Sequence, residues 1–391
     1  MTIDEHPIFV VLIVAVAAPL LAELRIGVRI PAVVLEVLLG MLVGPHLLGL
    51  LHPDLFFEYM KLAGMAAMMF MAGMEMDFEK IRGRPLRLAA GGWAASLGIA
   101  LVVVGVLHVI PGVRTPAMVA IALSTTGLGV LLPILRDGGQ LDTAFGRMMM
   151  AAGTLGELGP IVAVSLALST RYTSWQSFGM LFFFLALVAL AAAVGAGARP
   201  PRLLTFLGRT MHSSTQVPVR LALLVMAAFA TLAYVMGFEL ILGAFAAGLI
   251  VGIATQGPQG EELRVKIDAV FFGWFTPFFF IGTGMGFDLG ALARETSTMI
   301  LTPVFLLLFL FARGLPVFLY RRDIPGPQLL PFALSSSVAA LGLVVVITEI
   351  GLHAKNMNPE IAQALIAAAL LSLLVFPTLA GALLARNEPP K

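Results

Sequence analysis

Hydrophobic residues form long runs along this chain, and the short loops between the runs hold most of the charged residues. A helix that crosses the roughly 30 Å hydrocarbon core of a bilayer needs about 20 predominantly apolar residues. Runs close to this length predict thirteen spans, at residues 7–24, 31–51, 57–77, 86–110, 115–135, 146–169, 176–197, 217–237, 239–255, 268–287, 298–320, 327–352 and 359–385. Totals of twelve or fourteen stay open, because two pairs of neighbouring spans are joined by very short loops. The pattern predicts an all-α polytopic membrane protein.

Composition agrees with this prediction. Of the 391 residues, 59% are hydrophobic and 12% are charged, and the charged share is about half that of a typical soluble domain. The chain has no cysteine, which excludes disulfides and thiolate metal sites. The net charge of +2 fits basic cytoplasmic loops better than a nucleic-acid surface. We expect a lipid bilayer around the chain and no nucleic-acid partner.

Basic residues indicate the orientation of the chain. If the N-terminus is outside, most Lys and Arg residues fall in cytoplasmic segments, whereas Lys61 and Arg313 lie within spans. The external side then holds only Arg114, Arg171, Arg294 and Lys355. Cytoplasmic loops of membrane proteins carry such an excess of basic residues. We predict a multi-pass protein of the cell membrane with its N-terminus outside and its C-terminus in the cytoplasm.

Two halves of the chain resemble each other weakly. The segment "FMAGMEMDF" at 70–78 parallels "FIGTGMGFDL" at 280–289, with Met74 and Met285 offset by 211 residues. The segments "ALSTTGLGVLL" and "ALSSSVAALGLVV" have the same offset of 211, from Ser124 to Ser335. Because seven predicted spans separate the paired segments, the repeats would enter the membrane in opposite directions. Inverted repeats are typical of secondary transporters, whose substrate site lies at the midplane between the repeats.

Polar triplets interrupt the fifth and twelfth spans at corresponding places. The residues are Ser124, Thr125 and Thr126 in one span, and Ser335, Ser336 and Ser337 in the other. Hydroxyls in a membrane helix can simply bond back to the carbonyls of their own turn. Matched triplets also fit broken helices whose ends point at an ion near the membrane centre. Both interpretations stay open at this level.

Glu157 lies near the middle of the sixth span, where a charge is costly and usually functional. Burial favours the neutral form of a carboxylate, whereas a nearby cation favours the charged form. Glu157 could therefore hold a proton or a small cation such as Na⁺ but not both, and that exclusion is the basis of antiport. Thr154, one turn earlier, could add a hydroxyl ligand. Gly156, Gly159 and Pro160 are expected to weaken the helix and give room for an ion.

Arg313 lies about fifteen residues into the eleventh span. An arginine keeps its proton, so it needs a carboxylate, a helix C-terminus or water as a partner. A purely structural pair of Arg313 and Glu157 is the alternative to a functional site, although such pairs are expensive to bury.

Further segments carry a family resemblance. They are "RIPAVVLEVLLGMLVGPHLLGL" at 29–50, "MMFMAGMEMD" at 68–77, "TPFFFIGTGMGFDLGAL" at 276–292, and "LSTTGLGVLLPIL" followed by "GRMMMAAGTLGELGPIVAVSLAL". In their joint order these segments resemble the monovalent cation/proton antiporters of the Kef and Nap type, over nearly the whole chain. Glu157 falls where that family has its ion-binding Asp, and Arg313 falls where it has a basic residue.

The resemblance implies a fold like that of the Nha and Nap antiporters, with two inverted repeats and two crossed, broken helices. It implies a single transmembrane domain over residues 1–391, usually in a homodimer. Within it, spans at about 7–77 and 217–287 would form a dimerisation scaffold, spans at about 86–169 and 298–385 a moving transport core, and 176–197 a linker helix.

The expected function is exchange of a monovalent cation, Na⁺ or K⁺, for H⁺ by alternating access, without enzymatic catalysis and without a cofactor. The candidate ion- and proton-binding residues are Glu157, Thr154, Ser124, Thr125, Thr126 and Ser336, with Arg313 as charge partner and Ser335 and Ser337 in the crossing helices. The transported Na⁺ or K⁺ would bind at Glu157, and no resident metal is expected.

The chain departs from the family pattern at two neighbouring positions. The carboxylate is Glu rather than Asp, and Gly156 stands where Asp, Asn or Gln is common. A single carboxylate favours electroneutral exchange of one H⁺ for one cation. The alternatives are a proton-uncoupled K⁺ efflux protein, an Na⁺-coupled symporter of an organic anion, and a structural or assembly protein.

Overall fold

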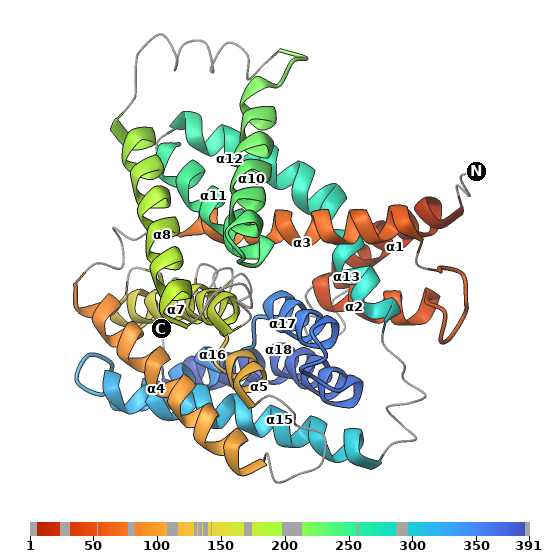
Figure 1. The fold of residues 1–391 in the computed structure, drawn as a ribbon. Coiled ribbons are helices and arrows are strands. Elements are labelled where there is room, and N and C mark those ends of the chain that lie inside the picture. The colour runs from red at the N-terminus through yellow and green to blue at the C-terminus, as the bar shows by residue number, and fades with distance from the viewer. Residues whose placement is uncertain are drawn as a thin grey trace. The chain divides into compact units, whose positions relative to one another are not determined.

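A computed structural model describes most of the chain as helices (Figure 1). The described residues are 6–23, 32–52, 54–76, 83–107, 116–128, 131, 135, 140–141, 143–167, 174–197, 213–255, 258–286 and 296–387. All regular elements in these ranges are helical, and a helix lies in each of the thirteen windows predicted from hydrophobicity. The prediction of an all-α fold is therefore confirmed.

Several of these helices have the length and composition of membrane spans. Within the described ranges, seven helices are long and apolar enough to cross a membrane, and a bent helix pair makes an eighth. Shorter apolar helices cover Ile8–Glu23, Ala32–Val43, Phe178–Ala193 and Leu240–Ala254. The chain is thus a multi-pass membrane protein, whereas the total of thirteen crossings and the inverted repeat stay predictions.

The chain divides into two compact units, and the first comprises residues 1–16, 50–76 and 165–284. Its elements are the first part of α1 (His6–Glu23), α3 (Leu55–Glu75), α8 (Ser174–Gly197), α10 (Val217–Val235), α11 (Leu240–Ala254), α12 (Pro258–Val270), the π-helix η1 (Phe271–Phe275) and α13 (Thr276–Met285). Glycines let α3 and α11 approach closely, since a Cβ on Gly248 would lie 1.9 Å from the carbonyl oxygen of Phe70. Small residues at crossings are typical of helix packing in membranes.

The second unit comprises residues 17–49, 77–164 and 285–391. Its elements are α2 (Ala32–Val43), α4 (Arg84–Leu107), α5 (Pro116–Leu123), α7 (Ala144–Ala167), α15 (Thr296–Gly314), the 3₁₀ helix η2 (Leu315–Tyr320), α16 (Gly326–Ser336), α17 (Leu341–His353) and α18 (Pro359–Asn387). Helix α18 packs against α15, α16 and α17, in the blue part of Figure 1.

Helix α17 of this second unit is buried from Leu341 to Thr348. Val344, Val345 and Ile347 on successive faces of α17 are all 0% exposed. A helix that is apolar all round is stable only when other elements enclose it, and α5 and α18 both pack against α17. The assignment of scaffold and transport roles to parts of the chain stays a prediction.

Candidate functional site

The first interruption follows α5, where residues 124–127 leave the helix and Leu128 re-enters it. The hydroxyl of Ser124 donates to the carbonyl of Ile121 at 2.8 Å, and that of Thr125 donates to the carbonyl of Ala122 at 2.8 Å. Both hydroxyl protons are thus used within their own turn. These two residues follow the simpler of the two interpretations, in which the hydroxyls bond back to the backbone.

The second interruption separates α16 from α17, and the two helices are bent by 42°. Ser337 Oγ donates to the carbonyl of Ala333 at 2.7 Å, while Ser336 Oγ contacts the same carbonyl at 2.9 Å and that of Arg313 at 3.1 Å. Ser335 is buried as well. Between the helices, the N–H of Ala339 donates to Ser372 Oγ on α18 at 3.0 Å. The only sequence signal for Ser372 was a single hydroxyl in an apolar stretch.

Hydrogen bonds join the two interruptions directly. The N–H of Gly127 donates to the carbonyl of Val338 at 2.8 Å, and Thr126 Oγ1 donates to the carbonyl of Ser336 at 2.6 Å. Glycine is required here, because a Cβ on Gly127 would lie 2.8 Å from the carbonyl oxygen of Ala339. The two non-helical segments therefore cross in contact, 210 residues apart in sequence.

Glu157 on α7 lies against the first interruption. The N–H of Leu128 donates to Glu157 Oε1 at 2.9 Å, and the N–H of Thr126 donates to the carbonyl of Gly156 at 3.0 Å. Leu128 begins a helical segment, and the amides at a helix start attract negative charge. Glu157 is half-buried, and Thr154 one turn earlier is 2% exposed.

Arg313 is 5% exposed and lies at the same crossing. Its Nε donates to Thr126 Oγ1 at 2.7 Å and to the carbonyl of Ser336 at 3.4 Å. Its Nη1 donates to Ser96 Oγ on α4 at 3.3 Å, and its Nη2 donates to the carbonyl of Ala152 on α7 at 3.1 Å. One guanidinium thus binds both interruptions and two further helices.

These bonds refine the roles that the sequence suggested. The carbonyl of Ser336 ends α16, so one of the three predicted kinds of partner for Arg313, a helix C-terminus, is present. The hydroxyl of Thr126 donates to the carbonyl of Ser336 and accepts from the guanidinium of Arg313. Because this oxygen already faces one positive charge, it is a poor ligand for a transported cation. Ser96 was not predicted as a partner of Arg313, although it is the only hydroxyl residue in α4.

The glycines near Glu157 do not open a space for an ion, contrary to expectation. A Cβ on Gly156 would lie 2.6 Å from Thr126 Cβ and 3.0 Å from Arg313 Nη2, and one on Gly159 would lie 2.3 Å from the indole of Trp93. Helix α7 continues without a break through Pro160. The missing side chains admit neighbouring groups instead.

Comparisons with known proteins agree on one family. The family model described as "Sodium/hydrogen exchanger, transmembrane" matches residues 10–386. YjbQ of Bacillus subtilis is 24% identical in an alignment 399 residues long. The alignment covers 98% of this chain and 63% of the length of YjbQ. The Na⁺/H⁺-K⁺ antiporter GerN of Bacillus cereus is 23% identical over 388 residues, which cover 94% of each protein.

A solved structure shares the fold. The sodium proton antiporter MjNhaP1 from Methanocaldococcus jannaschii, solved at pH 8, superposes with a TM-score of 0.68 at 18% identity. The match covers 97% of this chain and 98% of that chain. The predicted antiporter-like fold class is thereby confirmed.

The crowding at position 156 predicts a difference between two glycines of α7. Gly156→Ala places a methyl group against Thr126 Cβ, and overpacking of this kind costs about 1–3 kcal/mol. Gly153→Ala is the matched control, because its Cβ would meet mainly the flexible end of Leu128, at 2.7 Å. We expect thermal unfolding of the purified protein to show a lower Tm for Gly156→Ala only. Equal Tm values for the two variants would contradict this account of Gly156.

Replacement of Arg313 tests its contacts with four elements. Arg313→Ala leaves the acceptors on Thr126, Ser336, Ser96 and Ala152 without their donor, and we expect a loss of about 3 kcal/mol or more of stability. The stability of Arg313→Lys should lie between those of wild type and Arg313→Ala. Lysine keeps the positive charge, but its ammonium lacks the planar fork of a guanidinium. Urea unfolding would measure the free energy of unfolding of both variants, with exposed Arg220→Ala as control. An Arg313→Ala protein as stable as the control would refute the role.

Proposed function

The chain belongs to the sodium/hydrogen exchanger family, and on this premise we propose that it exchanges a monovalent cation for H⁺ across the membrane. The observation that carries the proposal is the position of Glu157, whose Oε1 accepts from Leu128 N–H where two interrupted helices cross. Secondary transporters bind ions at such crossings because unwound backbone supplies polar groups within the membrane.

Competition at one carboxylate supplies the coupling in this proposal. Glu157 binds either a proton or the cation, since each neutralises the same negative charge. The amide of Leu128 orients the carboxylate in both states. Alternating access of the residues around the crossing, from one side of the membrane to the other, then moves cations one way and protons the other.

Arg313 has a different part in this proposal. Its charge is solvated by hydroxyl and carbonyl oxygens from four elements, so it holds the crossing in shape while the occupant of Glu157 changes. We propose it as a positioning residue rather than as a group that binds the transported ion. Thr154 and the hydroxyls of Ser335 and Ser336 stay candidates for ion contact, all of them buried.

Na⁺ and K⁺ both stay candidates for the cation, and the name of GerN includes both ions. We also propose a homodimer with the N-terminus outside, as the sequence predicts. Selectivity would follow from the relative KM values for Na⁺ and K⁺ at fixed pH.

Neutralisation of Glu157 tests the site. In proteoliposomes with a pH-sensitive dye inside, we expect wild type to move protons when Na⁺ or K⁺ is added outside, and Glu157→Gln to abolish the signal. Glu157→Asp should keep part of it, because the carboxylate is retained. Exposed Glu58→Gln on α3 is the matched control. Unaltered exchange by Glu157→Gln would contradict the carboxylate mechanism. Cation flux without a pH change in wild type would favour the alternative of a proton-uncoupled K⁺ efflux protein.

One-for-one exchange at Glu157 predicts an electroneutral cycle. Imposing a membrane potential on the same vesicles, with an ionophore for an ion that is not transported, should leave the initial rate of wild type unchanged. A rate that rises with one sign of potential and falls with the other would show net charge movement. That result would require a second titrating group in the cycle.

A further inference from the structure

We propose that Arg87, Arg321 and Arg322 form a binding site for the phosphate group of an anionic phospholipid. The site lies at the start of α4 and in the turn between η2 and α16, all within the second unit. It goes beyond the proposed exchange activity and does not depend on it. All three arginines are exposed.

Buried contacts fix the turn that carries Arg321 and Arg322. The preceding residue, Tyr320, is 3% exposed, and its ring centroid lies 4.6 Å from that of Phe332 on α16. The N–H groups of Asp323 and Ile324 donate to the carbonyl of Tyr320 at 2.9 and 3.0 Å. The two arginines are therefore displayed by a preorganised turn.

An ion pair fastens this turn to α4. Arg84 Nε and Nη2 donate to the two carboxylate oxygens of Asp323 at 2.6 and 3.0 Å. Asp323 is the only acidic residue in the sequence ranges 83–92 and 315–335. Because Arg84 already neutralises it, these two ranges keep an excess of positive charge. Arginine suits phosphate especially well, since its planar fork can donate two parallel hydrogen bonds.

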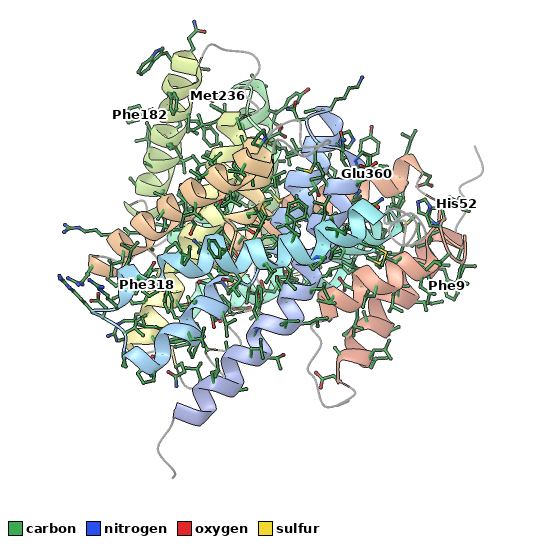
Figure 2. The ribbon with its side chains drawn as sticks, turned by 90° about the horizontal axis from the view of Figure 1, so that it is seen from below. Phe9, His52, Phe182, Met236, Phe318 and Glu360 are labelled. Atoms are coloured by element: carbon green, nitrogen blue, oxygen red, sulfur yellow. The ribbon has the colours of Figure 1, made fainter. Side chains whose placement is uncertain are left out.

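The position of the arginines along their helices indicates a lipid rather than a free anion. One candidate span ends at Tyr320 and another begins at Arg84, so both basic segments lie at the ends of apolar stretches. Directly before the turn, Phe318 is 63% exposed (Figure 2) and Leu319 is 46% exposed. An exposed apolar surface followed at once by arginines matches acyl chains followed by a phosphate headgroup.

A lipid bound here would connect two elements of the candidate site. Helix α4 carries Ser96, and η2 directly follows the helix that carries Arg313. A ligand that binds the folded state alone raises its stability. We therefore expect the second unit to be more stable in the presence of anionic phospholipid.

The test uses the full chain, purified in a neutral detergent. We expect phosphatidylglycerol to raise the Tm more than phosphatidylcholine does, and Arg321→Gln/Arg322→Gln to lose roughly half or more of that difference. The matched control is Arg147→Gln/Arg220→Gln, which removes two other exposed arginines and should keep the full difference. Phe318→Gln should weaken the response to phosphatidylglycerol while both arginines remain.

Three results would overturn the proposal. The first is a full phosphatidylglycerol effect in Arg321→Gln/Arg322→Gln. The second is an equal loss in the control pair, which would indicate general attraction between charges. The third is a Tm rise of the same size with inorganic phosphate alone, which would indicate a site for free anions.

Discussion

A guanidinium keeps its proton, so inside a membrane protein it must be solvated by protein groups. The crossing of the two interrupted helices depends on this requirement. Arg313 meets it with hydroxyls of Thr126 and Ser96 and with carbonyls of Ser336 and Ala152. The carbonyl of Ser336 is available because α16 ends there. The interruption and the buried charge therefore stabilise each other, since each supplies the polar partner that the other lacks.

The carboxylate follows the same principle with the opposite sign. Glu157 accepts from the amide of Leu128, the first residue of a helical segment. Helix starts present unpaired N–H groups and helix ends present unpaired carbonyls. Where two interrupted helices cross, both kinds of group meet in one place. The chain can thus hold a cation and an anion close together, each with backbone partners of its own.

Much of this arrangement could be predicted from the sequence, because hydrophobic runs, polar triplets and buried charges leave direct marks on it. Each predicted window contains a helix, and both triplets mark real interruptions. The partners of Arg313 could not be predicted in full, because a carbonyl such as that of Ala152 has no signature in the sequence. The expected room around Gly156 was wrong for a related reason: local composition does not show which distant group will fill a missing side chain.

The packing at the crossing requires that position 156 has no side chain. A side chain at position 156 and close contact between Thr126 and α7 exclude each other, because Thr126 Cβ lies 2.6 Å from where a Cβ would be. Without that side chain, the amides of Thr126 and Leu128 reach the carbonyl of Gly156 and the carboxylate of Glu157. The crossing segment therefore supplies backbone polar groups beside the carboxylate. A change in the crossing would then reach Glu157 directly, through backbone groups rather than through side chains.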